Sequence, residues 1–230
     1  MKKNIVDENQ KAWEDNATFW DNQMGDDSND FHNQVIKPKV SALLDIQKDD
    51  FILEIACGNG NYATYLAKQQ AKVIAFDFSK KMIALAKKRQ KEYLHQIEFH
   101  VIDATKPQEL KKLLKEKPYD KIVSNMAIMD IATIQPLFHF AYQCLKKGGI
   151  FVFATQHPCF VTLTNQYKTS HSYKGEAIAN QPTLQYYYHR SLQELFQTCF
   201  QAGFVMDGFE ESYYKRQEIP EVIIVRLKKE

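Results

Sequence analysis

An acid and two glycines stand close together in the first quarter of the chain. Glu54 comes four residues before Gly58, and Gly60 follows two residues later. A carboxylate near the end of a buried strand is costly unless it meets a partner. Glycine lets the backbone adopt positive φ and approach a ligand closely. Together these residues indicate a site for a ligand that carries positive charge.

The segments around this loop must position it. Residues 51–55 form a short apolar run, which predicts a strand buried on both faces, and residues 61–68 read as a helix. In a strand, glycine loop and helix in this order, the loop amides and the helix N-terminus face the ligand. Ala63 stands where the dinucleotide-binding fingerprint has its third glycine, so a Gly-x-Gly loop alone is weak evidence.

Two further acids follow at the ends of predicted strands. Asp77 ends the run 71–77, and it lies 19 residues beyond Gly58. A carboxylate at the carboxyl end of a second parallel strand can accept hydrogen bonds from both ribose hydroxyls. A third strand over 97–102 leads to Asp103.

Composition limits the class of protein. The 230 residues are 44% hydrophobic and 13% aromatic, which is typical of one globular domain. A net charge of +2 gives no reason to expect nucleic acid or an anionic membrane as a partner. The N-terminus lacks the apolar region of a signal peptide, and no apolar run reaches membrane-spanning length. Four scattered cysteines predict free thiols in a cytoplasmic protein and no metal site.

The rest of the chain continues the alternation of strands and helices. We expect helices over residues 5–22, 35–46, 80–93, 107–117, 133–145 and 191–202, and strands over 119–125, 150–155, 204–213 and 221–227. Ser79 and Ser191 are the expected N-caps, with Glu194 completing a capping box. Lys146, Lys147 and the glycines after them are expected to close a helix. Residues 156–189 show no clear period and are interpreted as an insertion.

Three stretches carry a resemblance to a known family. The Glu-x-x-Cys-Gly-x-Gly arrangement at 54–60 resembles motif I of the class I S-adenosylmethionine (SAM)-dependent methyltransferases. Leu-Lys-Lys-Gly-Gly-Ile-Phe-Val-Phe at 145–153 resembles the family's approach to its fifth strand. His-Pro-Cys-Phe at 157–160 and His-Arg at 189–190 are similar to a bacterial, small-molecule branch of the type-11 kind.

The resemblance covers nearly the whole chain and implies its fold. We expect an α/β, Rossmann-like, seven-stranded and mostly parallel sheet with helices on both faces, its last strand antiparallel, and an N-terminal helical cap. Residues 1–230 would form one methyltransferase domain. It would comprise the cap (1–47), the SAM-binding core (48–155), a substrate-region insertion (156–189), and a C-terminal helix with a β-hairpin (190–230).

The same resemblance assigns the cofactor site. The implied cofactor is SAM, with S-adenosylhomocysteine as product. In the resembled family the acid at Asp103 hydrogen-bonds the adenine amino group. The implied cofactor-binding residues are Glu54, Ala56, Cys57, Gly58, Gly60, Asp77, Phe78, Asp103, Ala104, Asn125 and Met126. For Cys57, a small buried hydrophobic residue is the simpler interpretation, and Asn125 would otherwise just end its strand.

The implied reaction is SN2 transfer of the sulfonium methyl group to N, O or C of a small molecule. Where DNA and RNA adenine methyltransferases have Asn/Asp-Pro-Pro-aromatic, this chain has Asn-Met-Ala-Ile at 125–128, which argues against a nucleobase acceptor. His157 is the first choice for a general base and His189 the second, although either can be structural. Arg190 would hold a substrate carboxylate or phosphate, or pair with Glu194.

Aromatic residues are the candidates for the acceptor pocket. Trp20 and Tyr187 are expected to contact substrate, and Trp13, Trp20, Phe31 and His32 to form a lid, although ordinary packing explains each of them singly. We expect a monomer or homodimer without nucleic-acid or membrane partners.

Two other functions fit parts of the pattern. A non-catalytic SAM or S-adenosylhomocysteine binder would keep the same cofactor residues without a usable acceptor pocket. An NAD-dependent oxidoreductase would share the glycine loop, but it would more often continue with a strand–helix–strand unit where this chain has two late strands without a helix between them.

Overall fold

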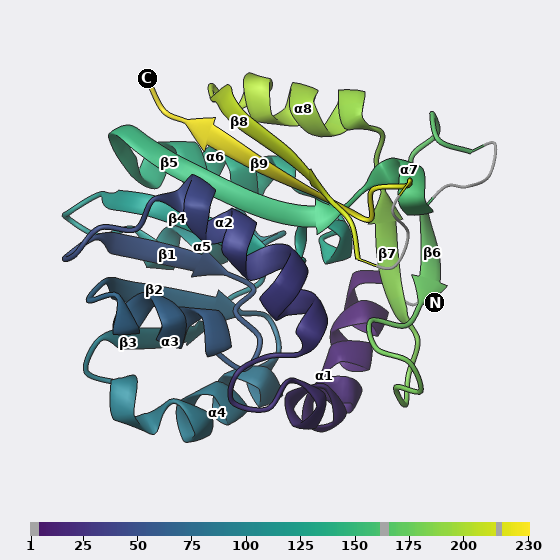
Figure 1. Cartoon of the computed structure of the whole chain (residues 1–230), viewed down its shortest axis with the longest axis horizontal. Coiled ribbons are helices and arrows are strands. Elements are labelled where there is room, and N and C mark those ends of the chain that lie inside the picture. Colours follow the sequence, from purple (N-terminus) through teal and green to yellow (C-terminus); the bar gives the residue numbers. More distant parts are fainter. Residues whose placement is uncertain (1–4, 162–165, 215–217) are drawn as a thin grey trace.

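A seven-stranded sheet forms the centre of the computed structural model, which describes residues 5–161, 166–214 and 218–230 (Figure 1). The strand order is β3-β2-β1-β4-β5-β9-β8. The first five of these strands are parallel, and β9 is antiparallel to both β5 and β8. The bounds are β1 (Phe51–Ile55), β2 (Lys72–Asp77), β3 (Ile97–Val101), β4 (Tyr119–Asn125), β5 (Leu145–Gln156), β8 (Val205–Ser212) and β9 (Val222–Lys228). The predicted fold class is confirmed.

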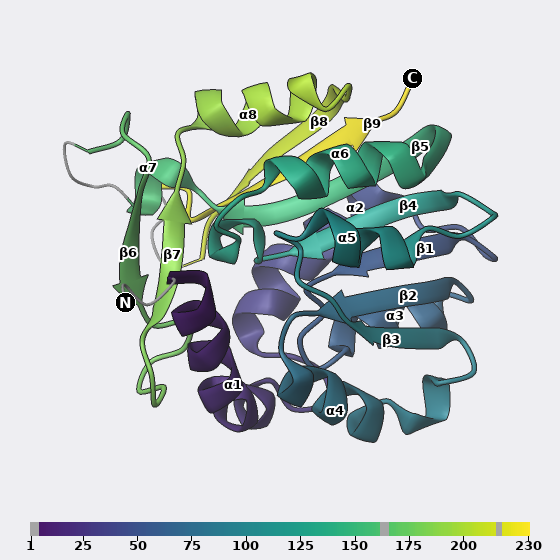
Figure 2. The same ribbon diagram turned by 180° about the vertical axis from the view of Figure 1, so that it is seen from behind.

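Helices cover both faces of this sheet (Figures 1 and 2). Helices α2, α3 and α4 pack on one face, and α5, α6 and α8 on the other. The helices are α1 (Ile5–Met24), α2 (Lys37–Leu44), α3 (Asn61–Lys68), α4 (Lys80–Arg89), α5 (Pro107–Leu110), α6 (Gln135–Cys144), α7 (Pro158–Val161) and α8 (Leu192–Gln201). Single turns are η1 (π, His32–Ile36) and the 3-10 turns η2 (Lys91–Tyr93), η3 (Lys111–Leu113) and η4 (Ile128–Asp130).

Each face of the sheet has its own core. Successive strand residues point to opposite faces, so Leu53 packs with the α6 side and Ile52 with the α2 and α3 side. Phe138 of α6 contacts Phe151 and Phe153 of β5, with ring centroids 5.4 and 5.6 Å apart. Parallel strands covered on both sides are apolar almost throughout, which is why the sequence shows them as continuous hydrophobic runs.

The segment expected to lack a period contains a second, two-stranded sheet. Strands β6 (His171–Gly175) and β7 (Gln185–His189) pair antiparallel, with His171 opposite His189. Strand β7 lies beside α1 (Figures 1 and 2), and the Tyr186 backbone N–H donates to Asn9 of α1. In β7 the side chains alternate between the two faces, so Tyr187 is buried while Tyr186 and Tyr188 are half-buried.

Several helix ends differ from the expected positions. The helix expected over 107–117 is a single α turn followed by a 3-10 turn. Helix α6 ends at Cys144, and the lysines expected in its last turn belong to β5, because Leu145 is already extended (ψ 144°) and Gly148 donates to the carbonyl of Lys229. Pairing with the C-terminal segment therefore overrides the helix-closing signal.

Both predicted N-caps are confirmed. The Ser79 hydroxyl accepts from the Met82 N–H at 3.1 Å, and the Ser191 hydroxyl accepts from the Glu194 N–H at 3.2 Å. The Glu194 side chain accepts from the Ser170 hydroxyl, so it ties α8 to the hairpin segment.

Arg190 fastens the hairpin to the main sheet. It is 9% exposed, and its guanidinium donates to the carbonyls of Ile128 (3.3 Å), Ile131 (2.6 Å) and Ala132 (2.8 Å) in the loop after β4. Burial lowers its pKa, and Glu194 partly offsets this. The predicted pairing with Glu194 is thus a long-range attraction, while the hydrogen bonds go to the backbone.

Replacing this guanidinium should destabilise the fold. Arg190→Met removes the guanidinium donor of four carbonyls, those of Ile128, Ile131, Ala132 and Tyr188, and we expect the free energy of unfolding to fall by about 2 kcal/mol or more. Urea denaturation followed by circular dichroism measures this change. Lys11→Met, which removes a solvent-exposed ion pair with Asp15, is the control and should have little effect. Equal stability of Arg190→Met and wild type would mean that the carbonyls find other donors at no cost.

Candidate active site

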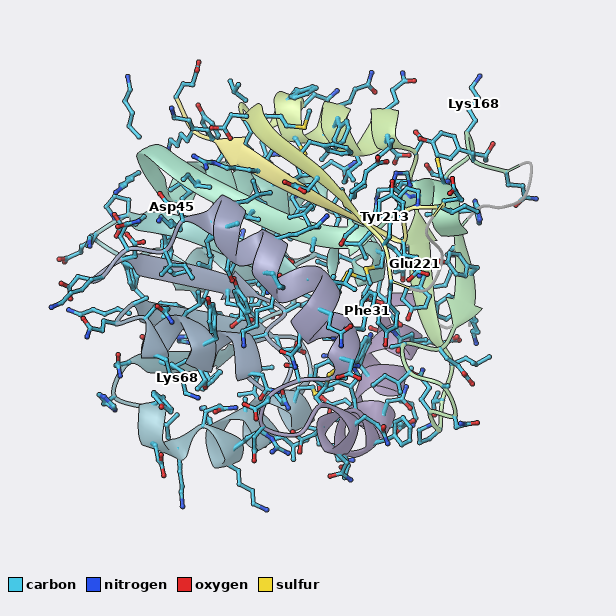
Figure 3. The ribbon with its side chains drawn as sticks, in the orientation of Figure 1. Phe31, Asp45, Lys68, Lys168, Tyr213 and Glu221 are labelled. Atoms are coloured by element: carbon cyan, nitrogen blue, oxygen red, sulfur yellow. The ribbon has the colours of Figure 1, made fainter. Side chains whose placement is uncertain are left out.

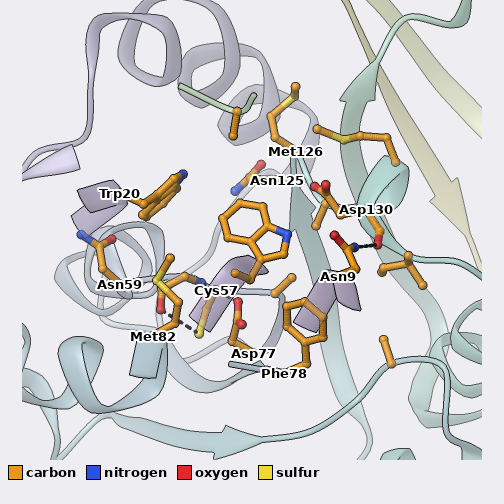
Figure 4. Close-up of a pocket in the computed structure, with 18 of the residues that line it drawn as sticks. Asn9, Trp20, Cys57, Asn59, Asp77, Phe78, Met82, Asn125, Met126 and Asp130 are labelled. Carbon is orange, nitrogen blue, oxygen red and sulfur yellow. Dashed lines mark hydrogen bonds between the residues drawn. The ribbon is translucent and has the colours of Figure 1, made fainter. Parts of the chain in front are cut away.

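A cavity of about 360 Å³ opens at the carboxyl ends of the parallel strands (Figure 4). Its walls include the residues that follow β1, β2, β3 and β4. The strand order reverses direction between β1 and β4, and ligands of open α/β sheets bind in the crevice at such a switch point. The volume is within the roughly 300–1,000 Å³ of small-molecule sites.

The glycine loop forms the floor of one end. Gly58 (φ +53°) and Gly60 (φ +78°) adopt left-handed conformations that favour glycine. A Cβ on Gly60 would come within 2.8 Å of the Phe99 ring, and one on Gly58 within 3.1 Å of Trp20. Gly58 lines the cavity, whereas Gly60 lies behind it and shapes the turn into α3.

Asp77 holds this loop to the end of β2. One of its carboxylate oxygens accepts from the Gly58 N–H at 3.1 Å, and the other accepts from the Ser79 N–H at 2.9 Å. Burial raises the pKa of Asp77 to about 6, although these backbone N–H bonds lower it. Each oxygen retains a second lone pair, so the carboxylate can still accept hydrogen bonds from a ligand.

Two residues at strand ends adopt positive φ without being glycine. Ala56 (φ +53°) follows β1, Met126 (φ +54°) follows β4, and both line the cavity. Left-handed conformations of ordinary residues cost of order 1–3 kcal/mol each and cluster at functional sites. The turn lets the Met126 N–H donate to the carbonyl of Ala154 on β5, so the loop after β4 begins against the sheet.

The carboxyl groups of Glu54 and Asp77, which are buried, and of Asp130, which is half-buried, line the cavity, and none of them forms an ion pair with a described lysine or arginine. Burial raises the pKa of Glu54, and the negative charge of Asp77 raises it further. Burial likewise raises the pKa of Asp130, with a smaller contribution from Asp77. Among the described residues, no lysine or arginine lines this cavity. His32 lines it, and burial lowers its pKa to about 4, so its ring is neutral near pH 7.

Several buried polar atoms on these walls have no partner within the described residues. They are Oε2 of Glu54, Nε1 of Trp13 and both amide atoms of Asn125. A buried polar group without a partner costs about 1–3 kcal/mol, so these atoms indicate a ligand that supplies the missing contacts. A cationic nucleoside with hydroxyl groups fits an unpaired carboxylate oxygen, an indole donor and an amide better than an anion does.

The N-terminal segment closes the cavity from one side. Trp20 of α1 lies over the glycine loop, and its ring is 6.4 Å from those of Trp13 and His32. Phe31 and Glu221, labelled in Figure 3, also line the cavity, although they are 190 residues apart. Asp21 of α1 accepts two hydrogen bonds from Arg89 of α4 and one from Asn59 in the glycine loop. This arrangement fixes α1 against the cofactor end of the cavity.

Most residues assigned from the sequence meet here. Except for Gly60, every predicted cofactor residue lines the cavity: Glu54, Ala56, Cys57, Gly58, Asp77, Phe78, Asp103, Ala104, Asn125 and Met126. Trp20 and Tyr187 line it as well. Asp103 is already engaged, since its carboxylate accepts from Thr105 and pairs with Lys106 at 3.1 Å.

The two histidines assigned as bases lie elsewhere. Neither lines the cavity. His157 is 3% exposed; its Nδ1 accepts from the Cys159 N–H and its Nε2 lies 3.0 Å from a Glu211 oxygen. His189 Nε2 lies 2.8 Å from the carbonyl of Tyr167. Both rings therefore join neighbouring segments of the chain, and neither faces the cavity. Arg190, the predicted substrate ligand, is likewise outside the cavity.

Sequence reasoning missed part of the acceptor side. Asn9, Asp130 and Gln156 line the cavity, and Tyr188 does so beside Tyr187. Asp130 could have been noticed as an acid five residues beyond the end of a buried strand, in an otherwise apolar run. Gln156 ends β5 and so has the same strand-end signal as Asp77 and Asp103, whereas Asn9 has none, because only the packing of α1 places it here.

Other kinds of site find no support in the described residues. Within residues 5–161, 166–214 and 218–230, no group of three or more His, Cys, Asp or Glu is placed to hold a metal ion. In the same residues, no helix is both long and apolar enough to cross a membrane.

Comparison with known proteins agrees with this geometry. A family model described as "Methyltransferase domain" matches residues 46–203. The malonyl-[acyl-carrier protein] O-methyltransferase of Bacillus cereus is 31% identical over 137 residues, which cover 56% of this chain and 48% of that protein. The chain thus spans about half the length of the curated relatives it matches.

Solved structures show the same fold. A SAM-dependent methyltransferase from Mesorhizobium loti superposes with a TM-score of 0.70 at 21% identity, covering 84% of this chain and 96% of that one. The magnesium protoporphyrin IX methyltransferase of Synechocystis, solved with bound SAM, gives a TM-score of 0.67 at 14% identity over 99% and 98% of the two chains. From the glycine loop, the carboxylate-lined cavity and the match over residues 46–203, the chain belongs to the class I SAM-dependent methyltransferase family.

Proposed function

We propose that this protein transfers the methyl group of SAM to a small-molecule acceptor at N, O or C. One observation carries the proposal: the buried carboxylates of Glu54 and Asp77 line the cavity beside the glycine loop, an oxygen of Glu54 has no partner, and no described lysine or arginine lines the cavity. SAM supplies a methyl group on a sulfonium, already activated for displacement. The protein's task is therefore to bind, orient and exclude water.

The cofactor residues divide by their place in the cavity. Glu54 would face the cationic part of the ligand, and Asp77 would accept hydrogen bonds from the ribose hydroxyls. Phe78, Asp103 and Ala104 would surround the adenine, with the ring between apolar side chains. Cys57 keeps a protonated thiol, because burial raises its pKa, so it acts as a small packing residue there.

The acceptor side would act by positioning. Holding two reactants in a near-attack geometry can supply roughly 7–11 kcal/mol of the barrier reduction. The α1 aromatics and Tyr187 line the cavity, where they would limit the access of water to the reacting atoms once both ligands are bound. This second wall, built from α1 and β7, supports a catalyst over a cofactor sensor, since binding the nucleoside alone would not require it.

An NAD-dependent oxidoreductase fits less well. Asp77 would suit the ribose of NAD as well as that of SAM, but the pyrophosphate at the glycine loop would lie near the buried carboxyl group of Glu54, with no described lysine or arginine on the walls. Strands β8 and β9 also pair directly as a hairpin at the sheet edge.

Further observations bear on the compartment and the class of acceptor. All four cysteines are free, which supports a reducing compartment such as the cytoplasm. The acidic lining of the cavity supports a small-molecule acceptor over nucleic acid, whose phosphates it would repel. A monomer or homodimer remains the expected assembly.

Removing the Asp77 carboxylate should weaken SAM binding. Asp77→Ala deletes the acceptor for the ribose hydroxyls and frees the Gly58 amide, and we expect a loss of about 1.5–3 kcal/mol in binding free energy. Isothermal titration calorimetry with SAM measures it. Asp207→Ala, an exposed acid on β8, is the matched control and should bind as wild type. A folded Asp77→Ala protein with wild-type affinity would remove Asp77 from the site.

SAM affinity should also rise with pH. Because the pKa of Asp77 is about 6 in the free protein and only the ionised form is a full acceptor, affinity should increase about tenfold from pH 5 to pH 7, with proton release on binding. Asp77 has the opposite effect on folding stability when no ligand is bound. Between pH 3.8 and about 6 the folded protein binds more protons than the unfolded chain, so the contribution of Asp77 to the free energy of unfolding falls as pH rises.

Titration calorimetry in two buffers of different ionisation enthalpy measures the SAM affinity and the number of protons released on binding. Asp77→Asn cannot titrate and should give a flatter profile than wild type. A wild-type affinity that is constant from pH 5 to pH 7, without proton release, would contradict the assignment.

A further inference from the structure

Asp130 lies on the cavity wall opposite the glycine loop. It ends the η4 turn, five residues after β4, and lines the cavity near Asn9 (Figure 4). It lies deep in the protein, yet its side chain retains exposed surface, which faces the cavity. The mechanism proposed above for the cofactor does not use it.

A chain of amides holds this carboxylate in position. Gln185 of β7 donates to Asp130 Oδ1 at 3.2 Å and to the Tyr187 hydroxyl at 3.1 Å, and it accepts from Gln181 at 3.2 Å. Asn9 of α1 donates to the Asp130 carbonyl at 3.2 Å. Among the described residues, Gln185 is the one hydrogen-bond donor to the carboxylate. The carboxylate is therefore oriented by one neutral amide and not neutralised.

The cavity wall around Asp130 is largely aromatic, and among the described residues no lysine or arginine lines it. The guanidinium of Arg190 lies outside the cavity, on the carbonyls of Ile128, Ile131 and Ala132. Trp13, Tyr187 and Tyr188 line the same cavity, with Phe31 and His32 nearer its rim. Glu176 and Glu221 add carboxylates from the hairpin loop and from the segment before β9. With no described lysine or arginine on the walls, an acceptor that carries a carboxylate or phosphate would find carboxylates there and no cation to pair with. Aromatic faces beside a carboxylate suit an ammonium group.

We propose that the methyl acceptor is a small primary or secondary amine, which Asp130 binds as the ammonium ion and deprotonates. This proposal rests on the methyltransferase function proposed above. It adds a class of acceptor and a catalytic residue that the sequence pattern did not identify.

The chemistry balances with these groups alone. The amine arrives with its proton, hydrogen-bonds to the ionised Asp130 and passes the proton to the carboxylate, so two opposite charges disappear together. The nitrogen lone pair then forms the N–C bond with the sulfonium methyl, while the C–S bond breaks and its electron pair goes to sulfur. The positive charge ends on the methylated nitrogen, and the proton leaves Asp130 to solvent when product departs.

The low polarity of the site favours this proton transfer. Burial raises the pKa of Asp130, which makes it a better match for an amine than an exposed aspartate. The titratable and charged groups around it are Asp77 at the end of β2, Tyr173 on β6, and Tyr187 and Tyr188 on β7. Arg190 adds a cation that donates to the carbonyls of Ile131 and Ala132 beside it. Burial raises the pKa of all three tyrosines, so they remain protonated while Asp130 titrates.

A matched set of small molecules tests the charge preference on the wild-type protein. Primary amines, alcohols and carboxylates on butyl, cyclohexylmethyl and phenylethyl skeletons are titrated into the S-adenosylhomocysteine complex by calorimetry, and methylation with SAM is followed by mass spectrometry. We expect the amines to bind at least about tenfold more tightly than the carboxylates of the same skeleton, and to be the compounds that are methylated.

Variants then test Asp130 itself. Asp130→Asn should weaken amine binding at least about tenfold and remove the rise of turnover with pH, because the proton acceptor is lost. Its SAM affinity should stay within about twofold of wild type. Asp207→Asn, the same change on an exposed strand, is the control for all three measurements.

The outcomes separate this proposal from the general function. Failure of the wild type to bind SAM refutes the methyltransferase function. Three results would overturn the amine proposal alone, provided that SAM still binds normally. The wild type could prefer carboxylates or alcohols, or it could bind no amine at all. Asp130→Asn could also keep the amine affinity and the pH profile of the wild type. If Asp130→Asn does not fold, the wild-type comparison of amines with carboxylates still decides.

Discussion

The central constraint on this structure is the burial of the Glu54 carboxyl group at the end of β1. Glu54 is 3% exposed and one of its oxygens has no partner, while Asp77 lies close enough to raise its pKa further. A fold selected for stability alone would put an apolar residue there, because an unpaired buried carboxylate is strongly unfavourable. A positively charged ligand would stabilise the Glu54 carboxylate, so the cavity favours the binding of a cation.

The walls around this charge come from distant parts of the chain. Strand ends supply the floor, α1 supplies a lid, and β7 closes the acceptor side. Direct hydrogen bonds join the last two: the Asn16 side chain exchanges two with the backbone of Thr183, and Asn9 receives one from Tyr186. Asp21 of α1 also accepts a hydrogen bond from Asn59 in the glycine loop. Movement of α1 would therefore affect the cofactor end and the acceptor end of the cavity together.

Polar residues in the chain beyond β5 have two different uses. Arg190, His157 and His189 look chemically active, but each is committed to backbone groups or to a neighbouring side chain. They stabilise an irregular segment that carries few apolar residues of its own, since buried backbone carbonyls and amides need partners. Asp130, Gln185 and Tyr187 form the network that does reach the cavity.

The sequence by itself determined the strands of the seven-stranded sheet and their sequence along the chain. It also determined the two helix N-caps and the residues at the cofactor end of the cavity. These features depend on local signals: apolar runs of strand length, glycines at a turn, and acids directly after strands. Gly58, Asp77 and Asp103 are near in space because the carboxyl ends of parallel strands meet at one edge. Only the tertiary structure decided the acceptor end. Whether His157 or Asp130 faces the ligand depends on how α1 and the β6–β7 hairpin pack, and long-range packing of that kind leaves no period or motif in the chain.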